Sequence, residues 1–377
     1  MTKILEKFKV LTKGKTVDFP FLFALVILLA IGLLALSSAS SYYALTETGD
    51  STYYFKRQLG FAIVGLVGMT IVSVMDHKKY KRLSYIFYIF ALGLMLMVEI
   101  PGLGVTVKGA KRWLDLGLFT FQPSEVLKLA LIMALALFIS DNQKKMKTWK
   151  GYVIPCGFLA GAGLFLYFQS HLSATLVMGV IFIVVMLSSG LKINWRVVIP
   201  LGILVMAIAG GIFLSEEYRR ERIFSFFNPD VDLTGSNWQP TQSLYAIGSG
   251  GLFGRGLGQS RQKYLWLPEA QNDFVFSVFA EEFGFVGSLF VVATFAFLIY
   301  RGVLIGLKSK DMYGMLTTLG IIGMFAFQII ANIAVVTKSI PTTGMPLPFF
   351  SYGGTSLLIN LAAMGIVLGV SRQNSKG

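Results

Sequence analysis

The sequence predicts an all-α polytopic membrane protein, and three observations lead to this fold class. Hydrophobic residues make up 55% of the 377-residue chain and charged residues only 14%, whereas a soluble domain carries roughly 25% charged residues. The mean hydropathy is +0.68. Apolar runs near the ~20 residues that a helix needs to cross a bilayer recur along the chain. Because these runs do not alternate, they exclude a membrane β-barrel and leave helices as the spanning structure.

We expect ten transmembrane helices in a single integral-membrane domain, with residues 1–18 and 371–377 as tails. The first apolar run is longer than the 7–15 residues of a removable signal peptide, so we expect it to be retained. In chain order the predicted spans are approximately Phe19–Ser40, Leu59–Met75, Leu83–Ile100, Val126–Ser140, Tyr152–Phe168, Ser173–Ser189, Val197–Ser215, Asp273–Tyr300, Gly314–Val336 and Thr355–Val370.

The distribution of lysine and arginine predicts that both termini face the cytoplasm. With the N-terminus inside, the inner tails and connections carry 20 of these residues and the outer side carries 12, half of them in one long loop. Lys128 falls within a span. The positive-inside rule gives most weight to short loops, and every short loop agrees with this orientation.

Two irregular segments lie on the predicted outer side. Residues 216–272 form a long extracytoplasmic loop between the seventh and eighth helices, and loops of that length are usually functional or disordered. Its aromatic residues, Trp238, Tyr245 and Trp266, favour a loop folded against the membrane. The second segment, Lys338–Gly354, contains three prolines and three glycines. Broken backbone at membrane depth needs cover by protein or water, so we expect the active face to be extracytoplasmic.

Several functional classes are disfavoured by composition. The single cysteine, Cys156, excludes an intramolecular disulfide, and the two histidines, His77 and His171, lie far apart and form no metal-ligand cluster. The glycine-rich run 246–258 fits no nucleotide-binding motif, so we expect its glycines to permit tight backbone turns or close approach to a substrate. The net charge of +14 is scattered between apolar segments, which favours an anionic or phosphorylated lipid over nucleic acid.

Four carboxylates surround the start of the eighth predicted span. Asp273 is expected at or just above the outer membrane interface, where apolar surroundings raise the pKa of a carboxyl toward the range useful for a general base. Alternatively, an aspartate at this position could cap the helix N-terminus. Glu269 could orient the loop. Glu281 and Glu282 lie deeper and are expected to pair with basic groups, since an unpaired charge there costs several kcal/mol. The basic residues of segments 218–222 and 111–113 are the predicted partners.

A second polar group lies at the start of the fourth span. Glu125 and Lys128 stand three residues apart on one helical face, next to Gln122. They could form an ion pair that only stabilises the bundle. Alternatively, they could belong to a basic outer pocket that holds the phosphates of a lipid-linked substrate.

Motifs along the whole chain resemble those of the SEDS family (shape, elongation, division and sporulation). The resemblance covers Asp18 to Arg372, and the loop motifs are closer to the FtsW and SpoVE branch than to RodA. The motifs that carry it are GAKRWL at 109–114, FQPSE at 121–125, QSLYAIGSGG at 242–251, GLGQS at 256–260, LPEAQNDF at 267–274 and LPFFSYGGTS at 347–356.

This resemblance implies a peptidoglycan glycosyltransferase in the bacterial cytoplasmic membrane. It would polymerise lipid II, the undecaprenyl-pyrophosphate-linked disaccharide pentapeptide, into β-1,4-linked strands for septal or spore cell wall. Asp273 matches the family's catalytic aspartate and would act as the base in an inverting displacement. The cations Lys111, Arg112, Arg219 and Arg222 would hold the pyrophosphate, with or without a Mg²⁺ or Mn²⁺ ion. The other candidate substrate-binding residues are Trp113, Gln122, Glu125, Lys128, Gln242, Glu269, Ser351 and Tyr352.

The resemblance also implies protein partners, a class B penicillin-binding transpeptidase and other divisome or elongasome proteins. The sequence departs from the family where His171 replaces a usual aspartate, where Gln271 and Asn272 replace a histidine–threonine pair, and where Thr343 replaces a lysine. Two alternatives stay open, a lipid II flippase and a non-catalytic scaffold for a transpeptidase. The polar motifs gather on one face and not at the midplane, which favours the enzyme.

Overall fold

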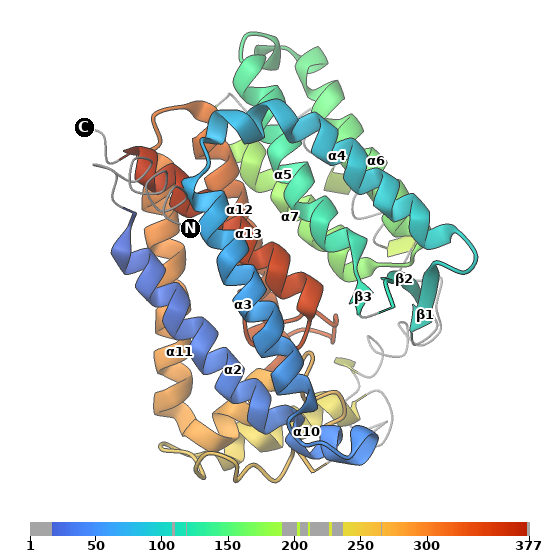
Figure 1. Cartoon of the computed structure of the whole chain (residues 1–377), viewed down its shortest axis with the longest axis vertical. Helices are drawn as coiled ribbons and strands as arrows, with labels where there is room; N and C mark the ends of the chain where they lie inside the picture. Colours follow the sequence, from blue (N-terminus) through green and yellow to red (C-terminus); the bar gives the residue numbers. More distant parts are fainter. Residues whose placement is uncertain are drawn as a thin grey trace, which may run out of the picture.

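Long helices packed side by side make up most of the molecule (Figure 1). This computed structural model describes residues 17–107, 110–117, 119–190, 202–203, 210–211, 226–227, 237–264 and 266–374. The helices are α2 (Phe19–Thr48), α3 (Tyr53–Val74), α4 (His77–Glu99), α5 (Pro123–Asp141), α6 (Val153–Phe168), α7 (Leu172–Ser188), α10 (Trp238–Ser249), α11 (Val275–Leu307), α12 (Met312–Val336) and α13 (Gly354–Asn374), with short 3₁₀ turns at Lys145–Lys147 and Trp149–Tyr152.

The helical fold agrees with a multi-pass membrane protein. Within the described residues, seven helices are long and apolar enough to cross a membrane, and α6 and α7 are shorter apolar helices. Each predicted span other than the seventh coincides with one of these nine. The seventh, Val197–Ser215, lies almost wholly outside the described residues, so the count of ten stays a prediction.

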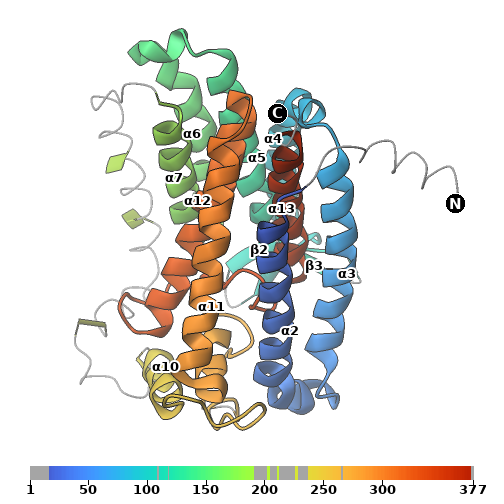
Figure 2. The same ribbon diagram turned by 90° about the vertical axis from the view of Figure 1, so that its left-hand side faces the viewer.

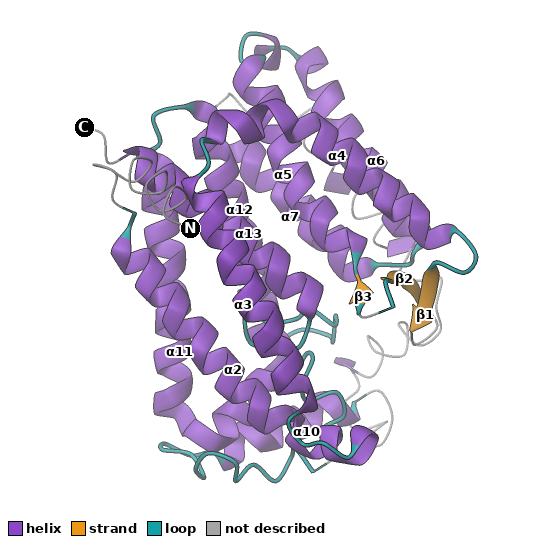
Figure 3. Ribbon diagram, viewed as in Figure 1, coloured by secondary structure: helices purple, strands orange, loops and turns teal. Residues whose placement is uncertain are grey.

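The prediction of a purely α-helical chain was wrong between α4 and α5. There the chain forms a small antiparallel sheet in the order β1 (Gly104–Val107), β2 (Ala110–Asp115) and β3 (Thr120–Phe121). Figure 3 shows its strands beside the ends of these helices. Val105 lies opposite Trp113, the kind of cross-strand pair that stabilises a sheet. The span-length criterion used on the sequence finds only long apolar runs, so it missed strands this short.

The described ends of the chain lie at one end of the bundle, and α10 lies at the other (Figures 1 and 2). Asp18, just before α2, accepts hydrogen bonds from the guanidinium of Arg301 in α11, and its backbone N–H donates to Ser371 Oγ in α13 at 3.2 Å. This cluster ties the start of the first described helix to the end of the last. The arrangement agrees with termini on one side of a membrane.

The helix α5 forms the centre of one half of the bundle. In its apolar window 94% of the residues are buried, against 28% in α3 and 22% in α11. The outer helices therefore leave apolar faces exposed, as lipid-facing helices do.

The helix α11 is broken near its N-terminal end. Gly284 has φ 68° and ψ −165°, a conformation open essentially only to glycine. The backbone of the glycine-rich run packs against the break: Arg255 N–H donates to Glu281 O at 3.0 Å, and Phe285 N–H donates to Gly251 O at 2.9 Å. A Cβ at position 254 would lie 2.1 Å from Glu282 O. The glycine run thus permits close packing against α11; its predicted approach to a substrate stays a prediction.

Candidate active site

Asp273 lies in the turn that precedes α11, at the end of the bundle opposite the described termini. The helix begins at Val275, and Phe274, not Asp273, is its N-cap residue. The backbone carbonyl of Asp273 accepts a hydrogen bond from Asn332 Nδ2 at 2.8 Å, and the same amide donates to Met345 O at 2.8 Å. Asn332 is fully buried in α12. It therefore joins the Asp273 turn to the segment that follows α12.

That segment, residues 338–353, passes directly beside the Asp273 carboxylate. A Cβ built on Gly344, whose φ is +67°, would lie 3.5 Å from Asp273 Oδ2. Tyr352 N–H donates to Gln271 O at 2.8 Å, two residues before Asp273. The two irregular segments that the sequence assigned to one side are thus in contact, and Asp273 lies where they meet.

The motif that contains Ser351 and Tyr352 is held by short polar contacts. Ser351 Oγ accepts from Leu347 N–H at 2.8 Å. Gln58 of α3 is buried, and its amide donates to Ser351 O and accepts from Gly353 N–H, both at 3.2 Å. Burial raises the pKa of the Tyr352 phenol. Both Gln58 and Asn332 escaped the sequence analysis, although each is an amide in an apolar helix, which is itself a signal of a buried polar role.

The predicted pair at the start of α5 is present. Lys128 Nζ lies 2.8 Å from Glu125 Oε1, and both side chains are buried. The adjacent Gln122 has its Nε2 atom 2.8 Å from Nε2 of His171. His171 caps α7, since its Nδ1 accepts from Ala174 N–H at 3.3 Å. The residue that replaces the family's aspartate therefore has a structural role at a helix start and also contacts Gln122.

The predicted pyrophosphate cations Lys111 and Arg112 lie on β2 and contact backbone carbonyls. Lys111 Nζ donates to Glu99 O at 2.9 Å. Arg112 donates to Gln169 O at 3.1 Å and to Ser170 O at 2.6 Å, in the turn between α6 and α7. The other two predicted cations, Arg219 and Arg222, lie outside the described residues.

Further contacts link this region to Asp273. Ser173 Oγ, at the start of α7, donates to Thr343 O, next to Gly344. Of the remaining candidates, Trp113 lies on β2, Gln242 is buried in α10, and Glu269, with φ 56°, accepts a hydrogen bond from Asn272 Nδ2. The described candidates thus occupy the sheet, the helix starts and the two irregular segments near Asp273.

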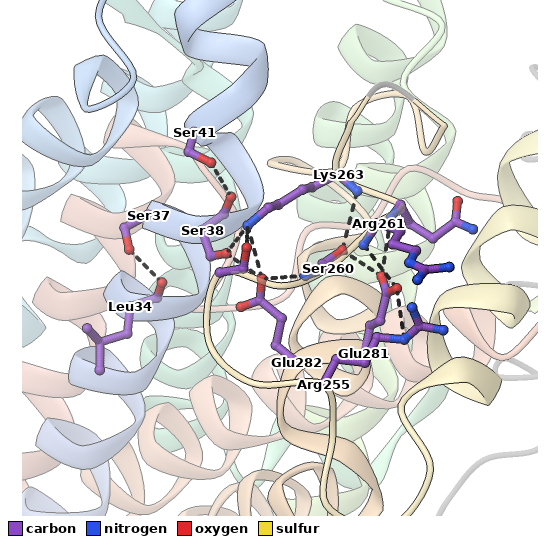
Figure 4. Close-up of polar contacts among 12 residues, drawn as sticks. Leu34, Ser37, Ser38, Ser41, Arg255, Ser260, Arg261, Lys263, Glu281 and Glu282 are labelled. Carbon is purple, nitrogen blue, oxygen red and sulfur yellow. Dashed lines mark hydrogen bonds and ion pairs between the residues drawn. The ribbon is translucent and has the colours of Figure 1, made fainter.

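Glu281 and Glu282 are buried and paired, as predicted, but their described partners are not those predicted from segment 111–113, and the predicted segment 218–222 lies outside the described residues. Lys111 and Arg112 are engaged elsewhere, and the partners come from the loop just before α11 (Figure 4). Lys263 Nζ lies 3.3 Å from Glu282 Oε1, and Arg255 Nε lies 3.7 Å from Glu281 Oε1.

Serine hydroxyls complete this buried cluster. Ser38 of α2 donates to Glu282 Oε1 at 2.6 Å, and Ser260 Oγ donates to Glu281 Oε2 at 2.6 Å. The cluster therefore connects α2, the long loop and α11, about two turns into α11 from Asp273. Carboxylates that are buried, hydrogen-bonded and paired with cations in this way stabilise the fold and are poorly suited to proton transfer.

The described residues contain no group of three or more His, Cys, Asp or Glu side chains that could hold a metal ion. A Mg²⁺ or Mn²⁺ ion carried largely by substrate phosphates, as Mg²⁺ often is, stays a prediction.

Comparisons with known proteins find relatives that match nearly the whole chain. Stage V sporulation protein E of Bacillus subtilis is 41% identical over 362 residues, covering 96% of this chain and 98% of that protein. The probable peptidoglycan glycosyltransferase FtsW of Trichlorobacter lovleyi is 38% identical, with 94% and 93% covered.

Solved structures give the same result. A structure on the coordination of polymerization and crosslinking by a peptidoglycan synthase complex superposes with a TM-score of 0.75 at 26% identity, covering 96% of this chain and 99% of that one. The rod shape determining protein RodA of Thermus thermophilus superposes with a TM-score of 0.71 at 28% identity and the same coverage. Residues 19–376 match the FtsW/RodA/SpoVE family, described as cell cycle proteins. The chain therefore belongs to this family, as its sequence motifs predicted.

Proposed function

We propose that the chain is a peptidoglycan glycosyltransferase that polymerises lipid II, with Asp273 as general base. Relatives at 36–38% identity over most of the chain carry the name peptidoglycan glycosyltransferase. The observation that carries the proposed role of Asp273 is its carboxylate beside Gly344, where the two irregular segments meet. A partly exposed carboxylate held by buried backbone contacts can reach a substrate and still keep a fixed position.

The proposed reaction is a single inverting displacement. Asp273 takes the proton from the 4-hydroxyl of the acceptor GlcNAc, and that oxygen attacks the anomeric carbon of the donor MurNAc. The bond from this carbon to the lipid pyrophosphate breaks, and α linkage becomes β-1,4 linkage. Lys111, Arg112, Arg219 and Arg222 would neutralise the departing pyrophosphate, which is the position where negative charge grows in the transition state.

The remaining candidates would position the substrate. Gln122, Glu125 and Lys128 form a polar group at the start of α5, next to the sheet that carries Trp113. Gln242 and Glu269 belong to the long loop, and Ser351 and Tyr352 belong to the second segment. All would act on the outer face of the bacterial cytoplasmic membrane, in a ten-span topology with both termini inside.

The proposed partner is a class B penicillin-binding transpeptidase, together with other divisome or elongasome proteins. A neighbouring solved structure concerns a synthase complex that both polymerises and crosslinks peptidoglycan. Crosslinking requires a transpeptidase, which a chain of this family would meet through its lipid-facing helices.

A flippase is the second candidate, because several buried charges lie in the bundle. A transporter would need exchangeable charges near the midplane. Here Glu281 and Glu282 each have a cationic partner within 4 Å. This pairing favours structural roles and therefore the enzyme.

The test uses the purified full-length protein in detergent with fluorescent lipid II. Wild type is expected to produce glycan strands, and Asp273→Asn to produce them at least a hundredfold more slowly, the range of a lost general base. Asp50→Asn, an exposed carboxylate at the same end of the bundle, is the matched control and should retain activity. Equal polymer from Asp273→Asn would remove this residue as base. Transbilayer movement of lipid II in vesicles without polymer would favour the flippase.

A further inference from the structure

Four tyrosines from three parts of the chain form a connected set of ring contacts at the Asp273 end of the bundle. Tyr54 lies at the centre: its ring centroid is 5.9 Å from that of Tyr43, 5.2 Å from that of Tyr53 and 4.8 Å from that of Tyr352. We call these four residues the tyrosine platform. They come from the end of α2, the start of α3 and the segment after α12.

The tyrosine platform is fixed relative to Asp273. Tyr352 N–H donates to Gln271 O, and Gln271 is two residues from Asp273. With Cα atoms 3.8 Å apart along the chain, the backbone of Tyr352 lies within roughly 12 Å of that of Asp273. One or two linked sugars span such a distance. Gln58 forms hydrogen bonds with the backbone of the residues on either side of Tyr352, so the backbone at Tyr352 is held to α3.

The platform combines apolar ring surface with polar groups. All four tyrosines are partly exposed, neither core nor fully solvated. The Arg57 guanidinium lies 5.4 Å from the Tyr53 ring centre, and its Nη1 donates to the Tyr53 hydroxyl at 2.7 Å. A sugar presents a C–H face to an aromatic ring and hydroxyls at its edge, which matches tyrosine. The stem peptides joined to the muramyl groups carry carboxylates, which an arginine can bind.

Two simpler explanations fit less well. A packing role alone would not need hydroxyls, yet the platform contains no phenylalanine although the chain has 32 Phe and 15 Tyr. Tyrosines that only anchor a helix in the lipid interface would point outward. Here the rings pack on one another, and the ring of Tyr54 contacts that of Tyr352, which belongs to the segment beside Asp273.

We propose that the tyrosine platform, with Arg57 at its edge, binds the growing glycan strand. It would hold the sugars that lie behind the donor sugar while that sugar reacts at Asp273. The inference rests on the proposed function, since it assigns a substrate subsite to the same reaction centre. Loss of the platform would then shorten the product without preventing the first coupling.

The test measures binding of a soluble tetrasaccharide of alternating GlcNAc and MurNAc to the purified full-length protein by calorimetry. Tyr54→Ala is expected to weaken binding about tenfold, because an aromatic contact is worth about 0.5–1.5 kcal/mol. Tyr54→Phe keeps the ring and loses only the hydroxyl, so it should weaken binding measurably but less than Tyr54→Ala does. Tyr245→Ala is the matched control, since Tyr245 is a 59% exposed tyrosine of α10 outside the platform. Tyr53→Ala provides a second variant if Tyr54→Ala unfolds at a lower temperature. Equal affinity in all variants would overturn the proposal.

A second readout separates this proposal from the proposed function. Asp273→Asn should bind the tetrasaccharide as wild type does while failing to polymerise lipid II. Tyr54→Ala should still form linkages but give shorter strands on a gel. If wild type binds the tetrasaccharide yet makes no polymer, only the proposed function fails. If it polymerises lipid II without binding the tetrasaccharide, only the platform fails.

Discussion

The ammonium of Lys263 lies 3.3 Å from the Glu282 carboxylate, and their side chains are only 5% and 1% exposed. Both charges have further partners: Lys263 donates to Gly258 O at 2.6 Å, and Ser38 donates to the same carboxylate oxygen. A buried pair of this kind adds little net stability, but removing one member leaves the other charge without compensation. The pair therefore acts mainly as a specific connection between the long loop, α2 and α11.

Lys263→Met is expected to lower the free energy of unfolding by about 3 kcal/mol or more, because Glu282 would then be a buried charge without its cation. Thermal or denaturant unfolding in detergent measures this. The double variant Lys263→Met/Glu282→Leu should lose less than the sum of the two single variants. Lys56→Met breaks the exposed Lys56–Asp50 pair and serves as the control, with a loss below about 1 kcal/mol expected. Additive losses in the double variant would contradict the pairing.

Gly284→Ala is expected to destabilise the protein by about 3 kcal/mol or more. The φ and ψ of Gly284 are poorly open to alanine, and the new Cβ would lie 2.3 Å from Gly254 N and 2.7 Å from Leu252 O. Gly60→Ala is the matched control, because Gly60 lies inside α3 with no atom within 4 Å of the new Cβ. That change should stabilise by about 0.5–1 kcal/mol. Unfolding measurements that gave both variants the same sign would be inconsistent with the break in α11.

Arg112→Lys tests whether geometry or charge matters at this position. Arginine donates from two nitrogens to Gln169 O and Ser170 O, and lysine cannot reproduce this fork. We expect a loss of about 2 kcal/mol in unfolding free energy, the size of one hydrogen bond to a charged group. Lys111→Arg, which disturbs a single bond to Glu99 O, should change it by less than about 0.5 kcal/mol. Unchanged stability in Arg112→Lys would mean that only the charge is needed.

Asp50, in the connection between α2 and α3, is expected to titrate at an unusually low pH. Hydrogen bonds from Thr52 and Lys56 lower the pKa of Asp50 from 3.8 to about 2. The folded-state pKa is depressed, so the stabilisation is present above about pH 4 and is lost as the pH falls toward 2. Thr52→Ala should raise this pKa toward 3.8 in a carboxyl NMR titration. Thr46→Ala, which bonds Tyr43 O instead, should leave it at about 2. A pKa that stays low in Thr52→Ala would assign the shift to another group.

The helices were predictable from the long apolar runs. In lipid such a run must bond its own backbone N–H and C=O groups, and a helix does this. The sheet of residues 104–121 was not predictable in the same way, since its strands are short and their pairing depends on neighbouring helix ends. The Glu125–Lys128 pair followed from helical spacing alone. The partners of Glu281 and Glu282 did not, because they come from turns whose course is set by the packing of glycines against α11.

The position of Asp273 could be predicted only in part. Its place at the start of the eighth span and on the same side as segment 338–354 followed from the apolar pattern. The approach of Gly344 to its carboxylate, and the amide of Asn332 that links them, depend on how α11 and α12 pack. No local pattern in the sequence contains that information.

The break at Gly284 divides α11 into two parts with different surroundings. The 24 residues from Gly284 to Leu307 are about 36 Å long, enough to cross a hydrocarbon layer of about 30 Å without help. The N-terminal part, which begins at Val275, is held by contacts with the loop and with Ser38. A thinner or thicker bilayer can then be met by tilting of the C-terminal part alone. The spacing between Asp273 and Gly344 is thereby insulated from changes in membrane thickness.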